Sequence, residues 1–395
     1  MSKPIAILGI ILAAWPAAGA AATVDAARAG AIGDGAKLDT TAIQGAIDSC
    51  AAAGGGTVRF PAGRYLTGTL QIRSGVTLHL DQGATLLGSP AASDYRNLDP
   101  FTDGSGNPMG YALIVAVDAA HVGIEGEGTI DGQGPQIKAR QNPFSIRPFL
   151  VRWVRCRDVV VRGVHLANPG AWTLNFSQTR GAVVEDVTIR SREERLTNND
   201  GINIDSSEHI RVRHCDVVSG DDALVIKSTS PTPCRDIVAS DCELSTRTNA
   251  IKLGTESLGG FEDISISHCR ITQTEMSGIA LYTVDGGDLQ HVSISDVAMD
   301  GVAVPISLRL GSRLKTFRAG DQPKPTGRLR DVTIQNVSAK NVGLIGLLIN
   351  GVPGHRVEEV TLKNITLEVP GGGPASAAGI NVPEQEAAYP EYNMF

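Results

Sequence analysis

The chain has 395 residues and a formal net charge of −7, and only 4% of its residues are aromatic. This acidic balance argues against general attraction to nucleic acid or to an anionic membrane surface, so neither is expected as a partner. With so few aromatic rings, a core must be built mainly from Val, Ile and Leu.

The first 22 residues have the features of an export signal. Lys3 gives a positive start, residues 5–15 form an apolar run, and Ala18-Gly19-Ala20 is a small-residue cleavage site. The run is too short to span a bilayer comfortably, and a membrane anchor is the alternative interpretation. We therefore expect a secreted or periplasmic protein in which residues 23–395 form a single domain.

A short helix is predicted soon after this signal. Residues 41–44 have the capping-box pattern, Ile43, Ala46 and Ile47 share one face, and Gly54-Gly55-Gly56 ends the helix. We expect this helix to cap the N-terminal end of the repeats that follow. No closing element is visible before Phe395, so we expect the other end to be incomplete.

The rest of the chain repeats short segments rich in β-branched residues. Their matching positions are residues 164, 187, 215, 242, 269, 297, 337 and 365. Most segments alternate apolar and polar residues, which indicates strands, and second strands follow in many repeats. A period near 27 residues without helices predicts a solenoid, while leucine-rich repeats would need a Leu/Asn consensus and propeller blades a longer period. We therefore predict an all-β fold, the right-handed parallel β-helix, whose outer surface accepts a linear polymer.

Six cysteines fit an oxidising compartment, but their pairing cannot be derived from the sequence. Cys215, Cys242 and Cys269 are 27 residues apart, so we expect them to stack as small apolar core residues. Recurring histidines lack the spacing of metal ligands, so we expect them to lie in the walls of the coils and to form no metal site. These histidines are His121, His165, His214, His268 and His291.

Two acidic motifs lie on neighbouring repeats. Asn198-Asn199-Asp200-Gly201 precedes Ser219-Gly220-Asp221-Asp222, with 21 residues between Asp200 and Asp221. A coiled repeat brings such loops side by side, and paired carboxylates are what acid–base cleavage of a glycosidic bond requires. Asp-Gly and Gly-Asp pairs are also common in turns, but two such motifs on adjacent coils favour catalysis by Asp200, Asp221 and Asp222.

Further candidates for contact with a substrate lie around these aspartates. They are Asn198, Asp205, Lys227, Arg247, Asn249, Lys252 and Tyr282. Each also has a structural interpretation, such as a surface turn for Asp205, a stem lying along the wall for Lys227, and packing for Tyr282.

The longest repeat carries an excess of cations. Arg309 and Arg313 begin a stretch in which lysine and arginine outnumber the single Asp321. One interpretation is a solvated loop. The other is a rim that binds carboxylates, because a planar guanidinium can hold a carboxylate through two hydrogen bonds.

Motifs along nearly the whole mature chain resemble one enzyme family. Residues 54–65, Gly128-Thr129-Ile130-Asp131-Gly132 and Pro169-Gly170-Ala171-Trp172 look like parts of pectin-degrading β-helix enzymes. The acidic motifs resemble those of glycoside hydrolase family 28, which contains polygalacturonases and rhamnogalacturonan hydrolases. The resemblance implies inverting hydrolysis of a pectic glycan without a cofactor. It implies that Asp221 is the general acid and that Asp200 and Asp222 hold and deprotonate the attacking water.

The sequence departs from this family at two motifs. The family's Gly-His-Gly falls on Arg247-Thr248-Asn249, so its histidine is missing, and its Arg-Ile-Lys falls on Ala280-Leu281-Tyr282, so both cations are missing. These departures argue against a plain endo-polygalacturonase. A rhamnogalacturonan-active, exo-acting or other-sugar relative fits better.

Two other functions remain open at the level of sequence. A lyase on the same fold would cleave acidic pectin by β-elimination, usually with Ca²⁺ bound by grouped aspartates. A glycan-binding or adhesion β-helix would keep the fold without catalysis. We expect the hydrolase, acting as a monomer on a pectic polysaccharide or oligosaccharide.

Overall fold

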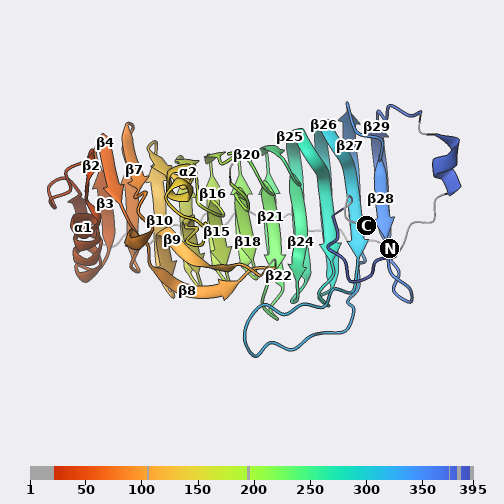
Figure 1. Ribbon diagram of the computed structural model, residues 1–395, viewed down its shortest axis with the longest axis horizontal. Coiled ribbons are helices and arrows are strands. Elements are labelled where there is room, and N and C mark those ends of the chain that lie inside the picture. The colour runs from red at the N-terminus through yellow and green to blue at the C-terminus, as the bar shows by residue number, and fades with distance from the viewer. Residues whose placement is uncertain (1–21, 105, 194–195, 373, 380–383, 392–395) are drawn as a thin grey trace.

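The computed structural model describes residues 22–104, 106–193, 196–372, 374–379 and 384–391. Residues 1–21 of the expected export signal lie outside the described residues. The described chain is an elongated stack of coils with helix α1 (Thr40–Ala52) at one end (Figure 1). Its strands pair almost entirely in parallel, which confirms the predicted parallel β-helix.

Strands of the described coils form three parallel sheets, and each sheet runs the length of the stack. The first sheet contains β1 (Ala22–Asp25), β3 (Gly56–Phe60), β6 (Val76–Leu80), β10 (Ala120–Gly126), β13 (Arg157–Arg162), β16 (Arg180–Glu185), β19 (Glu208–Arg213) and β22 (Cys234–Ser240). The second contains β2 (Asp34–Leu38), β4 (Gly63–Thr67), β7 (Ala84–Gly88), β11 (Thr129–Asp131), β14 (His165–Ala167), β17 (Thr188–Arg190), β20 (Asp216–Ser219) and β23 (Glu243–Thr246).

The third sheet carries the residues of interest. It contains β5 (Leu70–Gln71), β9 (Pro108–Val117), β12 (Phe149–Val154), β15 (Leu174–Ser177), β18 (Ile202–Asp205), β21 (Leu224–Ser228) and β24 (Ile251–Ser257). Strands β25 (Phe261–Thr283) and β26 (Leu289–Leu310) run continuously through all three sheets, and β27 (Val332–Lys340), β28 (Leu347–Asn350) and β29 (Val360–Leu367) extend the stack beyond them.

Inward side chains of the third sheet stack directly on one another. One column runs through Phe176, Ile204, Ile226, Leu253 and Leu281, and all five are buried. Because side chains alternate along a strand, the neighbouring positions of β18, β21 and β24 point outward. The period-2 pattern of the sequence therefore decides which residues reach the outer surface.

Sharp corners between the sheets explain the recurring histidines. His121, His214, His268 and His291 all have positive φ, as do the aspartates at equivalent corners such as Asp241. Asn, Asp and His tolerate this left-handed conformation better than most residues. Four of the five histidines predicted as wall residues thus occupy turns of the wall.

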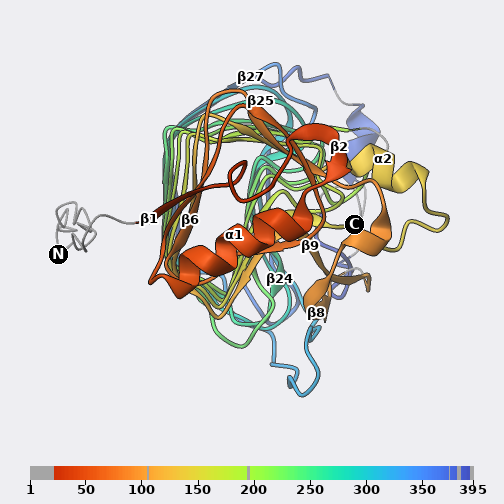
Figure 2. The same ribbon diagram turned by 90° about the vertical axis from the view of Figure 1, so that its left-hand side faces the viewer.

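Helix α1 covers the N-terminal end of the stack with Ile43, Ala46, Ile47 and Cys50 (Figure 2), as the sequence predicts. The predicted capping box is wrong. The helix begins at Thr40 after Asp39, whose carboxylate accepts hydrogen bonds from the backbone of the preceding turn.

Buried cysteines follow the predicted stacking. Cys215, Cys242 and Cys269 lie in consecutive coils, and each is at most 3% exposed. All six cysteines of the chain are buried free thiols in this structure. The three stacked thiols fill space as small apolar groups within the coils.

Several segments outside the coils lie beside the third sheet. Strand β8 (Asn97–Thr102) pairs antiparallel with β9, and a long irregular loop joins β26 to β27. The remaining helical elements are α2 (Gly134–Ala139), η1 (Ala92–Asp94) and η2 (Ala375–Gly379). Lys315 Nζ in the long loop donates to the Gly104 carbonyl beyond β8, 3.1 Å away, so the two excursions meet.

Removing a side chain from the stacked column tests this core. Ile226 is 1% exposed between Ile204 and Leu253. We expect Ile226→Ala to lower the free energy of unfolding by about 2–5 kcal/mol, because it leaves a cavity that rigid coils cannot fill. Urea unfolding followed by circular dichroism measures the change. Exposed Ser265→Ala on β25 is the control, and an equal effect of both would contradict the stacked core.

Candidate active site

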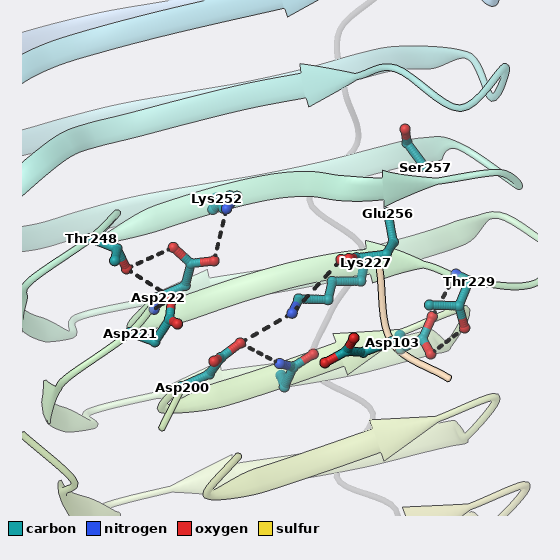
Figure 3. A network of polar contacts seen from close by, with 12 residues as sticks. Asp103, Asp200, Asp221, Asp222, Lys227, Thr229, Thr248, Lys252, Glu256 and Ser257 are labelled. Carbon is teal, nitrogen blue, oxygen red and sulfur yellow. Dashed lines mark hydrogen bonds and ion pairs between the residues drawn. The ribbon is translucent and has the colours of Figure 1, made fainter. Parts of the chain in front are cut away.

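Stacking of the coils places four residues in one column just before the strands of the third sheet. The backbone N–H of Thr173 donates to the Asp200 carbonyl, Gly201 N–H donates to Asp222, and Ala223 N–H donates to Asn249. Trp172, Asp200, Asp222 and Asn249 are therefore equivalent positions of successive coils. The two acidic motifs lie side by side, as the sequence predicts (Figure 3).

Asp200 is 1% exposed and is held by two N–H donors. Its Oδ2 accepts hydrogen bonds from Asn203 Nδ2 at 2.8 Å and from Lys227 Nζ at 3.1 Å. Both donors are outward side chains of the third sheet, Asn203 from the same coil and Lys227 from the next one. The carboxylate is thus fixed by groups that favour its charged form.

Asp222 has a denser set of donors and is 3% exposed. Its Oδ1 accepts from Asn249 Nδ2 at 2.9 Å and from Thr248 Oγ1 at 2.9 Å, while Lys252 Nζ lies 3.0 Å from Oδ2. Neighbouring Asp221 is half-buried and therefore the most open of the three aspartates.

Thr248 joins Asp221 to Asp222. Its Oγ1 lies 3.2 Å from Asp221 Oδ1 and 2.9 Å from Asp222 Oδ1. A hydroxyl has one proton to donate, so a donation to Asp222 leaves its lone pairs to accept from a protonated Asp221. The sequence places Thr248 where the resembling family has a histidine, but it does not reveal this bridging contact.

The three aspartates have different pKa values. Burial raises the pKa of Asp200 well above its usual range, against the charge of Lys227, and burial and the charge of Asp222 raise the pKa of Asp221. Burial also acts to raise the pKa of Asp222, but Lys252, Lys227 and the Asn249 hydrogen bond outweigh it and lower that pKa. Asp222 is therefore the carboxyl that stays ionised, and Asp221 can carry a proton.

Lys227 lies at the centre of the site and is 7% exposed. Its Nζ is 4.1 Å from the centroid of the Trp172 ring and 3.8 Å from Glu256 Oε2, in addition to its contact with Asp200. Burial opposes its charge, but Asp200 and Glu256 raise its pKa. The lysine remains a cation that links carboxylates on two coils.

Of the predicted binding residues, Asn198, Arg247, Asn249 and Lys252 also lie around the aspartates. Asn198 Oδ1 accepts from Arg147 Nη2 at 3.0 Å, and Arg247 is half-buried beside Thr248. Asp205 is 1% exposed, and its two oxygens accept from the backbone N–H and the hydroxyl of Thr229. The Asp205 carboxylate is therefore used in hydrogen bonds between coils and is not presented on the outer surface.

Tyr282 and Arg313 are buried on the same side of the stack. Tyr282 is fully buried and its hydroxyl lies 3.1 Å from Ser307 Oγ, so its ring face is not presented for stacking on a sugar. Arg313 makes two hydrogen bonds, of 2.8 and 2.6 Å, with the buried carboxylate of Asp285. The guanidinium of Arg313 is therefore held within the protein and not displayed on a rim.

Arg309 is 3% exposed and reveals a segment that sequence reasoning missed. Its Nη2 donates to the Glu384 carbonyl at 2.6 Å. The segment 384–391 then continues to Glu391, which contacts Lys252 and Asn249. No local pattern signals this approach, because some 140 residues separate Glu391 from its partners.

No helix in the described part of the chain combines the length and apolar character needed to cross a membrane.

Comparison with known proteins gives concordant matches. The model of glycosyl hydrolases family 28 matches residues 50–388. A probable polygalacturonase of Vitis vinifera is 28% identical, covering 86% of this chain and 73% of its own, and an endo-polygalacturonase of Pectobacterium carotovorum subsp. carotovorum is 27% identical, covering 83% and 84%. The solved polygalacturonase from Erwinia carotovora ssp. carotovora is 25% identical with a TM-score of 0.68, covering 84% of this chain and 91% of its own.

Removing the central cation tests the electrostatics of this site. We expect Lys227→Met to lower the free energy of unfolding at pH 7 by about 3–5 kcal/mol, because Glu256, whose pKa Lys227 lowers against the effect of burial, loses the cation that compensates its buried charge. The loss should shrink as pH falls, because Glu256 without Lys227 takes up a proton at higher pH than in the wild type. Urea unfolding at pH 7 and pH 4 measures this dependence, with exposed Lys363→Met as the control. An equal loss at both pH values would contradict a buried charge pair.

Proposed function

The chain belongs to glycosyl hydrolases family 28, and we propose that it hydrolyses a pectic polysaccharide or oligosaccharide with inversion at the anomeric carbon. The observation that carries the proposal is the pair of adjacent coils that bring Asp200, Asp221 and Asp222 together with unequal pKa values. Inverting hydrolysis needs one protonated and one ionised carboxyl around the scissile bond.

Asp221 is the proposed general acid. Its pKa is raised, it is the most open of the three aspartates, and it has Thr248 as a hydrogen-bond partner. A proton retained on Asp221 passes to the glycosidic oxygen as the bond to the leaving sugar breaks. Asp200 is less suited to this role, because two N–H donors hold its Oδ2.

Asp222 and Asp200 are proposed to act on the attacking water. Asp222, whose pKa is lowered, accepts the proton as the water oxygen bonds to the anomeric carbon, and Asp200 orients that water from the adjacent coil. Activity is then lost at low pH when Asp222 is protonated and at high pH when Asp221 is deprotonated. No cofactor is required by this scheme.

A lyase mechanism has less support. β-Elimination needs a neutral basic group to remove a proton, but both lysines of the site pair with carboxylates and have raised pKa values. An adhesin would have no need to keep three carboxylates with unequal pKa values. The polygalacturonases among the relatives support a pectic substrate, and the missing family cations leave a rhamnogalacturonan as the alternative pectic glycan.

We further propose that the protein is exported and acts as a monomer. The apolar segment of residues 5–15 supports export. A single stack that carries the whole carboxylate cluster on one chain is consistent with a monomer.

Turnover with matched variants tests the reaction type. We expect wild-type protein to release reducing ends from polygalacturonan or rhamnogalacturonan without the absorbance of an unsaturated sugar, and Asp221→Asn to lose about 10²–10⁴-fold in kcat. Asp216→Asn, at an exposed ion pair of the second sheet, is the control. Unsaturated product would establish a lyase, and equal rates for both variants would refute the role of Asp221.

Thr248 provides a second test. We expect Thr248→Val to lower kcat about 10- to 100-fold, because each hydrogen bond to a charged group contributes about 1.5–3 kcal/mol. Thr248→Ser keeps the hydroxyl and should retain most of the activity. Steady-state kinetics on the active substrate compares the two, and equal losses would show that the methyl group matters instead of the hydroxyl.

A further inference from the structure

Glu391 reaches the active site from a distant part of the chain. Its Oε1 lies 2.6 Å from Lys252 Nζ, and its two oxygens lie 3.1 and 3.2 Å from Asn249 Nδ2. Glu391 is 4% exposed, Lys252 is 2% exposed and Asn249 is fully buried. A buried carboxylate with these short contacts is an integral part of the site and not a surface ion pair.

The two groups that Glu391 holds are the same two groups that hold Asp222. Lys252 Nζ lies 3.0 Å from Asp222 Oδ2, and Asn249 Nδ2 donates to Asp222 Oδ1 at 2.9 Å. Lys252 and Asn249 therefore stand between two carboxylates.

The segment that carries Glu391 is anchored independently of this contact. Arg309 Nη2 donates to the Glu384 carbonyl, and Ser312 N–H donates to the Glu386 carbonyl at 2.7 Å. The ring of Tyr389 lies 5.7 Å from Lys252 Nζ and 5.7 Å from the Arg313 guanidinium. These contacts explain what the cations Arg309 and Arg313 do: they hold segment 384–391 against the third sheet.

We propose that Glu391 is a positioning residue for the hydrolytic reaction, which fixes Lys252 and Asn249 so that they hold Asp222 in place and ionised. The inference rests on the proposed role of Asp222 as the base. In metal sites, carboxylates that orient the metal-binding side chains have a similar function, and their loss costs about 10–100-fold. Lys252 consequently forms ion pairs with two carboxylates, Asp222 and Glu391. It does not replace the Arg and Lys of the family motif that are missing at Ala280 and Tyr282.

Glu391 shares the charge of Lys252 with Asp222. The charged and titratable groups around Asp222 are Asp200, Asp221, Lys227, Lys252, Tyr389 and Glu391. Burial raises the pKa of Glu391, against the charge of Lys252, whereas the pKa of Asp222 is lowered, so Glu391 takes up a proton before Asp222 as pH falls. Glu391 therefore acts on Asp222 through position: without Glu391, Lys252 and Asn249 hold Asp222 less firmly and the pKa of Asp222 rises, as it does when Lys252 is removed.

Substitutions of Lys252 and Glu391 test the proposal. We expect Lys252→Gln to move the acid limb of kcat/KM to higher pH by about one unit or more, and Glu391→Ala to move it in the same direction by a smaller amount. We expect Glu391→Ala to lower kcat about 10- to 100-fold with KM changed less than about twofold, because the donors of Asp222 lose their fixed positions. Glu386→Gln is the matched control, since Glu386 is exposed in the same segment and accepts the hydrogen bond of Ser312 through its backbone carbonyl.

A readout without turnover separates this proposal from the proposed function. In protein labelled with ¹³C at aspartate carboxyls, Asp222→Asn identifies the Asp222 resonance, and the pKa of Asp222 should be higher in Glu391→Ala but not in Glu386→Gln. An inactive wild type with these shifts would refute the hydrolytic function but support the positioning role of Glu391. Unchanged titration of Asp222 and unchanged kcat would overturn the positioning role. A higher kcat/KM in Glu391→Ala would also overturn it, by showing that the segment obstructs the site.

Discussion

The register between successive coils is the constraint on which this molecule depends. Parallel backbone hydrogen bonds fix each coil on the next, so residues at equivalent positions share one column whatever their distance along the sequence. The column that brings Trp172, Asp200, Asp222 and Asn249 together is set by these bonds. A slip of one residue would turn the outward carboxylates and lysines into the aliphatic core.

Buried charge is the second constraint, and it connects the fold to the chemistry. Three aspartates lie close together with two lysines, so the site has fewer cations than carboxylates before Glu256 and Glu391 are counted. Such a cluster cannot hold every carboxylate ionised. The lysine on β24 keeps Asp222 charged, while burial keeps a proton available on Asp221. Asp222 can thus act as the base because Lys252, on the next coil, lies 3.0 Å from its Oδ2.

Much of this arrangement could be predicted from the sequence. Alternating β-branched segments at a regular period predict the stacked coils, and two acidic motifs on adjacent repeats predict the carboxylate cluster. Family membership confirms the predicted glycoside hydrolase. These features are predictable because each depends on local pattern and on a repeat that the chain itself displays.

Contacts between distant segments could not be predicted in this way. The cations of the long loop suggest an open rim, but Asp285 neutralises Arg313, and segment 384–391 covers Arg309. Glu391 has no motif that links it to Lys252. The capping box fails for a similar reason, since Gln44 instead exchanges hydrogen bonds with the backbone of Gln71. In each case a partner far along the chain decides the role of the residue.

The anomeric configuration of the first product, followed by ¹H NMR during cleavage of a pectic oligosaccharide, distinguishes inversion from retention. We expect the inverted anomer to appear first and to mutarotate afterwards, because Asp222 and Asp200 direct water to the face opposite the leaving group while Asp221 protonates it. Retention of configuration would contradict this mechanism, since that outcome requires one of these carboxylates to act as a nucleophile.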